Sequence, residues 1–131
     1  MATFSELDTL ARSLPEVEVK LSPDGRPEYR VREKLFILHR PLRKDAVDPE
    51  TGELMDDVLM IRTPGLEVKE ELLADETLPL FTTAHFLGWP AVLLRIRDLA
   101  EVSQDALRHL VTQAWRTQAP KRLVKGWEGC R

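Results

Sequence analysis

The chain has 131 residues and a formal net charge of −3, with 43% hydrophobic and 31% charged residues. This length is typical of one domain, expected here to span 1–131, and the composition excludes an intrinsically disordered chain. The acidic balance excludes a uniformly basic nucleic-acid-binding protein, although it is compatible with a basic face.

The cysteine content and the apolar runs bear on the compartment. Cys130 is the only cysteine, which excludes an internal disulfide and is typical of a reducing compartment. Apolar runs are far shorter than the roughly 20 residues of a spanning helix. The N-terminus carries Glu6 and Asp8, where a signal peptide would be basic and then apolar. We therefore expect a cytoplasmic protein with no membrane partner.

The first elements in chain order are a helix and a strand pair. Thr3 and Glu6 have the spacing of a capping box, and an apolar stripe follows until Pro15 ends the helix. Apolar and charged residues then alternate over 17–21, which predicts a strand. A turn signal at 22–25 is followed by a second alternating segment around Tyr29 and Val31.

A long hairpin comes next. The buried run Leu35–Leu38 predicts a strand that leads to His39, and Val58–Arg62 predicts the returning strand. Between them, 40–54 contains Pro49 and Gly52, which are typical of a turn at a protruding tip. The acidic residues of this loop predict a solvated tip that could also engage a basic protein partner.

The second half of the chain predicts a helix, two strands and a last helix. Thr63 is expected as the N-cap of the first of these helices, with Pro64 at its first position. Segment 80–87 is expected to include a short strand, and 91–96 is a strong strand. Ser103 caps the last helix, which ends at Pro120 and leaves a basic tail over 119–131. This order predicts an α+β fold with helices on an antiparallel sheet.

Several short motifs in this order resemble the MmcQ/YjbR-like family of small bacterial proteins. Each motif is degenerate alone, but together they span nearly the whole chain. They are Leu7-x-x-Leu10-Ala11-x-x-Leu14-Pro15-Glu16-Val17, Tyr29-Arg30-Val31, Lys34-Leu35-Phe36, Leu72-Leu73-Ala74-Asp75, Gly88-Trp89-Pro90-Ala91-Val92 and Ala119-Pro120-Lys121-Arg122.

The resemblance implies a two-layer α-β(3)-α-β(2)-α fold, described as CyaY-like or secretion-chaperone-like. It also implies DNA binding through a double-wing arrangement. The loop over 40–54 departs from the family pattern because it is longer and acidic toward its tip. This departure argues against a DNA contact by that particular loop.

The charge is unevenly distributed along the chain. Segments 20–44 and 108–131 each carry a net charge of +5, whereas 45–76 carries −9. If the two basic segments meet in space, they could neutralise several phosphates, and a tryptophan nearby could stack on bases. The candidate nucleic-acid-binding residues are Arg30, Arg32, Lys34, Arg40, Arg43, Lys44, Trp89, Lys121, Arg122 and Lys125.

Two other interpretations of these residues stay open. The basic segments could be solvated faces balanced by the acidic segment. The domain could also bind a protein partner or itself, through the open face of the sheet or through the tail with Trp115 and Trp127. The remaining large aromatic residues, together with Trp89 and Trp115, are expected in the core; Trp89 could also be half exposed.

The sequence gives no support for an enzyme. It lacks the common nucleophile and nucleotide-binding motifs, and we expect no cofactor. His39, His85 and His109 are far apart, and the acidic loop does not have calcium-ligand spacing, so we expect no metal. His85 is the one histidine that would merit a test.

Overall fold

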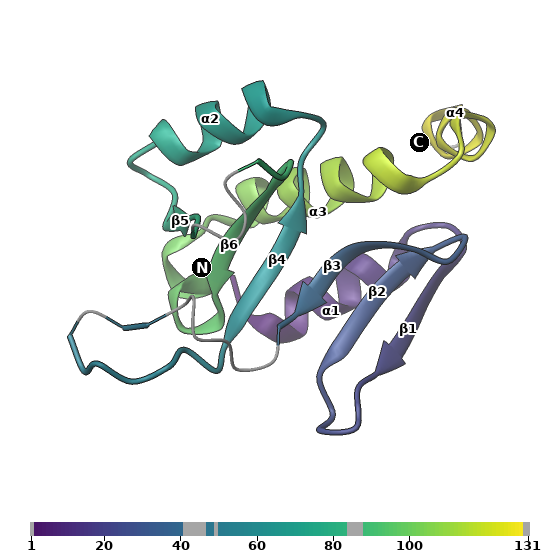
Figure 1. Cartoon of the computed structure of the whole chain (residues 1–131). Helices are drawn as coiled ribbons and strands as arrows, with labels where there is room; N and C mark the ends of the chain where they lie inside the picture. Colours follow the sequence, from purple (N-terminus) through teal and green to yellow (C-terminus); the bar gives the residue numbers. More distant parts are fainter. Residues whose placement is uncertain (1, 41–46, 49, 84–87, 130–131) are drawn as a thin grey trace.

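The computed structural model describes residues 2–40, 47–48, 50–83 and 88–129, with side chains described as far as Trp127. Figure 1 shows a twisted sheet with helices packed on it. The elements are α1 (Phe4–Ser13), β1 (Val17–Leu21), β2 (Pro27–Val31), β3 (Lys34–His39), β4 (Val58–Arg62), α2 (Leu66–Ala74), β5 (Leu80–Phe81), β6 (Ala91–Arg95), the 3₁₀ helix η2 (Ile96–Glu101), α3 (Gln104–Gln118) and α4 (Lys121–Gly129). The α+β class expected from the sequence is confirmed.

Two details differ from the fold that the resemblance implied. Four strands rather than three lie between α1 and α2, because hairpin β3–β4 follows hairpin β1–β2 directly. The basic tail expected over 119–131 contains helix α4, a further α-helix that the resemblance did not imply. Its apolar residues recur at the spacing of a helical face, which gives the segment a reason to fold onto the domain.

The sheet has the strand order β1-β2-β3-β4-β6-β5, and every neighbouring pair is antiparallel. Its register defines two ends. Val31 pairs with Lys34, and Arg62 pairs with Ala91, so the β2–β3 turn lies at the same end as the end of β4 and the start of β6. The β3–β4 loop, which contains the expected turn at Gly52, lies at the opposite end (Figure 1).

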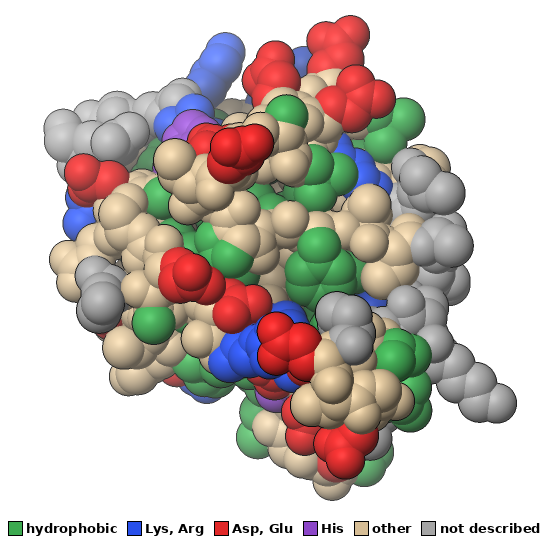
Figure 2. Space-filling view, turned by 90° about the vertical axis from the view of Figure 1, so that its left-hand side faces the viewer, with side chains coloured by type: hydrophobic (Ala, Val, Ile, Leu, Met, Phe, Trp, Pro, Cys, Tyr) green, Lys and Arg blue, Asp and Glu red, His purple; other side chains and the backbone are tan. Residues whose placement is uncertain are grey.

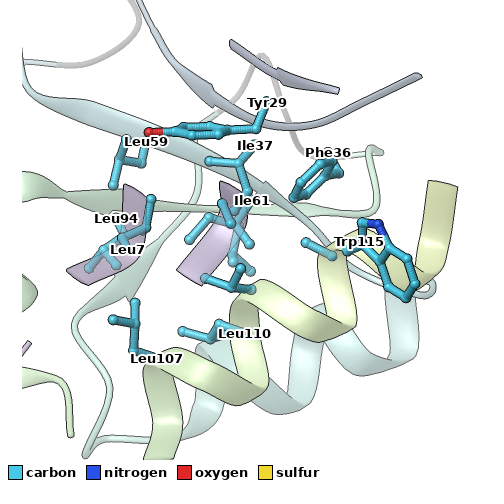
Figure 3. Packing of buried hydrophobic residues seen from close by; sticks show 14 of the residues in the cluster. Leu7, Tyr29, Phe36, Ile37, Leu59, Ile61, Leu94, Leu107, Leu110 and Trp115 are labelled. Carbon is cyan, nitrogen blue, oxygen red and sulfur yellow. The ribbon is translucent and has the colours of Figure 1, made fainter. Parts of the chain in front are cut away.

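Helices α1 and α3 cover one face of the sheet. The main core lies between these two helices and that face of the sheet (Figure 3). Trp115 and Tyr29 are among its largest fully buried side chains. The Tyr29 hydroxyl donates to Asp8 Oδ1 at 2.6 Å, and burial raises the pKa of this phenol. A register shift in β2–β3 leaves both Phe36 and Ile37 in this core, as a β-bulge allows.

The N-cap residues of the helices can be compared with those that the sequence predicts. Thr3 accepts a hydrogen bond from the Glu6 N–H at 3.1 Å, and Ser103 accepts one from the Ala106 N–H at 3.1 Å, so both expected caps are confirmed. The expectation for Thr63 is wrong, because Gly65 is the N-cap of α2. The Thr63 N–H donates to the Pro90 carbonyl at 2.7 Å, which holds this residue in line with the sheet.

Two other expectations concern aromatic packing and membranes. Trp89 is 53% exposed and does not belong to the core, whereas Trp115 does. The expected aromatic residue Phe86 and the candidate His85 lie outside the described residues. Across the described part of the chain, no helix combines the length and the hydrophobicity that a membrane crossing requires.

Candidate nucleic-acid interface

Helix α4 is held against the domain by Trp127. Its ring contacts Trp115 edge to face with centroids 5.2 Å apart. The Arg116 guanidinium carbon lies 5.2 Å from the centroid of the same ring. An aromatic pair of this geometry stabilises by about 0.5–1.5 kcal/mol beyond its buried area. The tail tryptophan therefore packs back onto the core and fixes the orientation of α4.

This orientation directs the basic side chains of α4 outward. Lys121, Arg122 and Lys125 are all exposed, and none has an ion pair with a described side chain. A hollow of about 260 Å³ lies beside them. It is lined by Arg116, Ala119, Lys121, Val124 and Lys125. The exposed side of α4 is thus a cationic surface next to a concave one.

The β2–β3 turn contributes a second set of cations. Arg32 and Glu33 have φ values of 50° and 68°, the left-handed conformation that a two-residue hairpin turn requires. Both the Nε and the Nη2 of Arg32 donate to the Glu16 carboxylate, and this pairing lowers the pKa of Glu16. Arg32 is therefore held in an ion pair with Glu16. Lys34 is exposed and has no ion pair with a described side chain.

A chain of contacts joins this turn to α4. The Trp115 indole Nε1 donates to the Pro15 carbonyl at 3.1 Å, and Pro15 directly precedes the Glu16 that pairs with Arg32. Figure 1 shows α4 and the turn at the same side of the molecule. Helix α4 and the turn form the surface we call the basic end. Its residues are Arg32, Lys34, Lys121, Arg122 and Lys125.

Trp89 lies at the same end of the sheet, just before β6. The Arg62 guanidinium carbon is 5.3 Å from the centroid of its ring, so the two side chains stack. The buried Lys69 donates from Nζ to the backbone carbonyl of Trp89 at 2.7 Å, and burial lowers the pKa of Lys69. Sequence reasoning missed Arg62 as the partner of Trp89, because the pairing of β4 with β6 that brings the two together is not visible in the sequence.

The structure places the other candidate residues elsewhere. Arg30 lies on β2 and donates to the Glu28 carboxylate at 2.6 Å, so its charge is balanced within the strand. The expectation for Arg40 is wrong, because this residue is 4% exposed and its N–H donates to the Val58 carbonyl at 2.8 Å. A side chain at this depth is not available to a phosphate. Arg43 and Lys44 lie outside the described residues.

The acidic β3–β4 loop is anchored rather than wholly solvated, which corrects that expectation. Asp48 is 5% exposed and accepts from Arg95 at 2.7 Å and from Arg97 at 3.2 Å, while Arg95 also donates to Asp57 at 2.8 Å. These ion pairs attach the loop to β6 and η2. Figure 2 faces this side of the molecule, where basic side chains lie among carboxylates. The loop is therefore directed away from the basic end.

Comparison with known proteins gives one family and several close relatives. The model of the YjbR family matches residues 12–117. An uncharacterized protein of Mycobacterium bovis and one of Mycobacterium tuberculosis are each 38% identical to the chain over 136 residues, covering 97% of this chain and 96% of the relative. No solved structure shows a significant match.

Proposed function

This chain belongs to the YjbR family, and from that membership and the geometry above we propose that it binds nucleic acid, with DNA as the first candidate, through its basic end. The observation that carries the proposal is the outward face of α4. Lys121, Arg122 and Lys125 are exposed there without an ion pair from any described side chain. Exposed lysine and arginine side chains bind phosphates and release the counterions condensed on them, which is the main source of affinity in nonspecific binding.

The distribution of acids and bases supports the same surface. The buried Asp48 is engaged with Arg95 and Arg97 at the opposite end of the sheet. Its negative charge is therefore compensated by its arginine partners and lies away from the basic end. The partly exposed Trp89 adds an aromatic ring on which an unpaired base could stack.

Two arginine variants test this proposal with a matched control. Arg122→Glu reverses a charge on α4, whereas Arg108→Glu reverses a charge on an exposed residue of α3. Arg108 lies about 15 Å along the helix axis from the end of α3. We expect wild type to bind a fluorescent duplex with a Kd of about 10⁻⁴–10⁻⁶ M, as nonspecific binders do.

The comparison is read by fluorescence anisotropy at about 50 mM salt, a condition that favours phosphate contacts. We expect Arg122→Glu to raise the Kd about tenfold, which corresponds to about 1.4 kcal/mol, and Arg108→Glu to change it less than about twofold. Equal effects of the two variants would contradict this surface. If neither duplex nor single-stranded DNA binds, the alternative of an interaction domain without a nucleic-acid role replaces the proposal.

A further inference from the structure

The two edges of the sheet differ in how well they are protected. The strand order places β5 at one edge and β1 at the other. Strand β5 is two residues long, whereas β1 spans Val17–Leu21 and pairs with β2 on one side only. Short edge strands offer little to a second chain, but a longer one presents a row of unpaired backbone groups. The β1 edge is the one that a further strand could extend.

The ladder between β1 and β2 shows which backbone groups face that edge. The Ser22 N–H donates to the Arg26 carbonyl at 2.9 Å, so position 22 is directed toward β2. Backbone groups alternate in direction along a strand in an antiparallel ladder. The N–H and C=O groups of Val19 and Leu21 therefore point outward. Pro27, which has no N–H, lies opposite Leu21, where none is needed.

The side chains of β1 form a pattern that is complementary to itself. An antiparallel copy centred on Val19 places Glu18 opposite the partner's Lys20, and the partner's Glu18 opposite Lys20. In this register the Val19 N–H and C=O would form hydrogen bonds with the C=O and N–H of the partner's Val19. Glu18 and the partner's Lys20 would form a pair without backbone hydrogen bonds, and side chains approach most closely at pairs of that kind. Both Glu18 and Lys20 are exposed.

The same register also explains an exposed apolar residue. Leu21 is 67% exposed, the largest value among the exposed large hydrophobic residues described. It lies on the face of β1 shared by Val17 and Val19, which are only partly buried against the core. In the paired arrangement, Leu21 would lie opposite the partner's Val17. Apolar cross-strand pairs of this kind stabilise a sheet.

From these observations we propose that the β1 edge binds a second copy of this chain, forming a continuous sheet across a two-fold axis. The symmetric interface follows from the order Val17-Glu18-Val19-Lys20-Leu21, which pairs with itself in one register. A contact between two five-residue strands is small, so the dimer is expected to be weak and dependent on concentration. The inference does not depend on DNA binding.

Charge-reversal variants of the edge test the register. We expect the sedimentation-velocity mass of the wild type to rise from 15.0 kDa toward twice that value between about 5 µM and 1 mM. Glu18→Lys alone and Lys20→Glu alone each place like charges opposite one another, and each should raise the dimer Kd about tenfold. The swapped double variant Glu18→Lys/Lys20→Glu should bring the Kd back toward the wild-type value without reaching it, because the swapped charges lie opposite Arg30 and Glu28 of β2.

A mixture of the two single variants distinguishes lost pairing from lost folding. When Glu18→Lys and Lys20→Glu are mixed in equal amounts, opposite charges again meet across the edge, and a heterodimer should form where neither variant self-associates. Circular dichroism spectra that match the wild type would verify that each variant is folded. A mass that stays at 15.0 kDa up to about 1 mM, or no association in the mixture, would overturn the proposal.

Discussion

Asp48 connects the β3–β4 loop to the rest of the domain. It is nearly buried and accepts hydrogen bonds from Arg95 Nη1 at 2.7 Å and from the Glu50 N–H at 2.8 Å. The bond from Arg95, followed by that from the Glu50 N–H, holds the pKa of Asp48 below its ordinary value. The loop is therefore attached most firmly when this carboxylate is ionised.

The lowered pKa gives a pH dependence with a definite sign. A carboxyl group whose pKa is lower in the folded state stabilises the fold above its unfolded pKa of about 3.9, and this contribution is lost as the pH falls through the folded value. We expect Asp48→Asn to lower the thermal unfolding midpoint at pH 7 and to differ less from the wild type at pH 3.

Glu53→Gln is the matched control, because Glu53 is an exposed carboxylate of the same loop for which no ion pair with a described residue is found. Its unfolding midpoint should follow the wild type at both pH values. A deficit of Asp48→Asn that is the same at pH 7 and at pH 3 would mean that ionisation of Asp48 does not hold the loop.

At the scale of an element, the β2–β3 turn carries a conformational cost. Glu33 has a φ of 68° and is not a glycine, and this conformation costs an L-residue about 1–2 kcal/mol. Glycine adopts it without that cost. We expect Glu33→Gly to raise the free energy of unfolding by about 1 kcal/mol in urea denaturation, because the Arg32–Glu16 ion pair and the Glu33 carbonyl bond to Arg30 remain.

A glycine at the next position, Lys34, should change the free energy of unfolding in the opposite direction. Lys34 begins β3 and is not among the residues with positive φ. Glycine relieves no strain there and only increases the conformational entropy of the unfolded chain. We therefore expect Lys34→Gly to lower the free energy of unfolding by about 0.5–1 kcal/mol. A destabilising effect of Glu33→Gly would show instead that the Glu33 side chain contributes more than its backbone costs.

Elements governed by local contacts were predictable from the sequence. The caps Thr3 and Ser103 act on N–H groups three residues away, so their spacing was sufficient. Thr63 has the same residue type but donates its N–H across to Pro90, a contact that no local pattern reveals. Helix α4 was missed because Pro120 was interpreted as an end, whereas proline also suits the start of a helix.

At the scale of the whole molecule, the charge summed along the chain identified α4 as basic. For the segment over 20–44 it overestimated the number of cations that are available to a ligand. Arg32 is paired with Glu16 and Arg30 with Glu28, and the first of these pairs joins the residue before β1 to the residue after β2. Arg40 is buried. A sum along the chain counts all three as available cations. The cations left without an ion pair could be identified only once the register of the sheet was known.

The central claim is that a small set of unpaired cations at one end of the sheet binds phosphates. Lys34, Lys121, Arg122 and Lys125 are the exposed cations there without an ion pair from a described side chain. If each neutralises one phosphate of a duplex, the logarithm of the binding constant falls with the logarithm of salt with a slope of about −3.6. Between 50 and 200 mM salt this is a loss of about 150-fold.

The most direct test is this slope, measured by anisotropy titration for the wild type and for Lys121→Glu/Arg122→Glu. We expect about −3.6 for the wild type and about −1.8 for the double variant, because two phosphate contacts are removed. An affinity that does not change with salt, or a slope that the double variant leaves unchanged, would contradict binding of nucleic acid through the basic end.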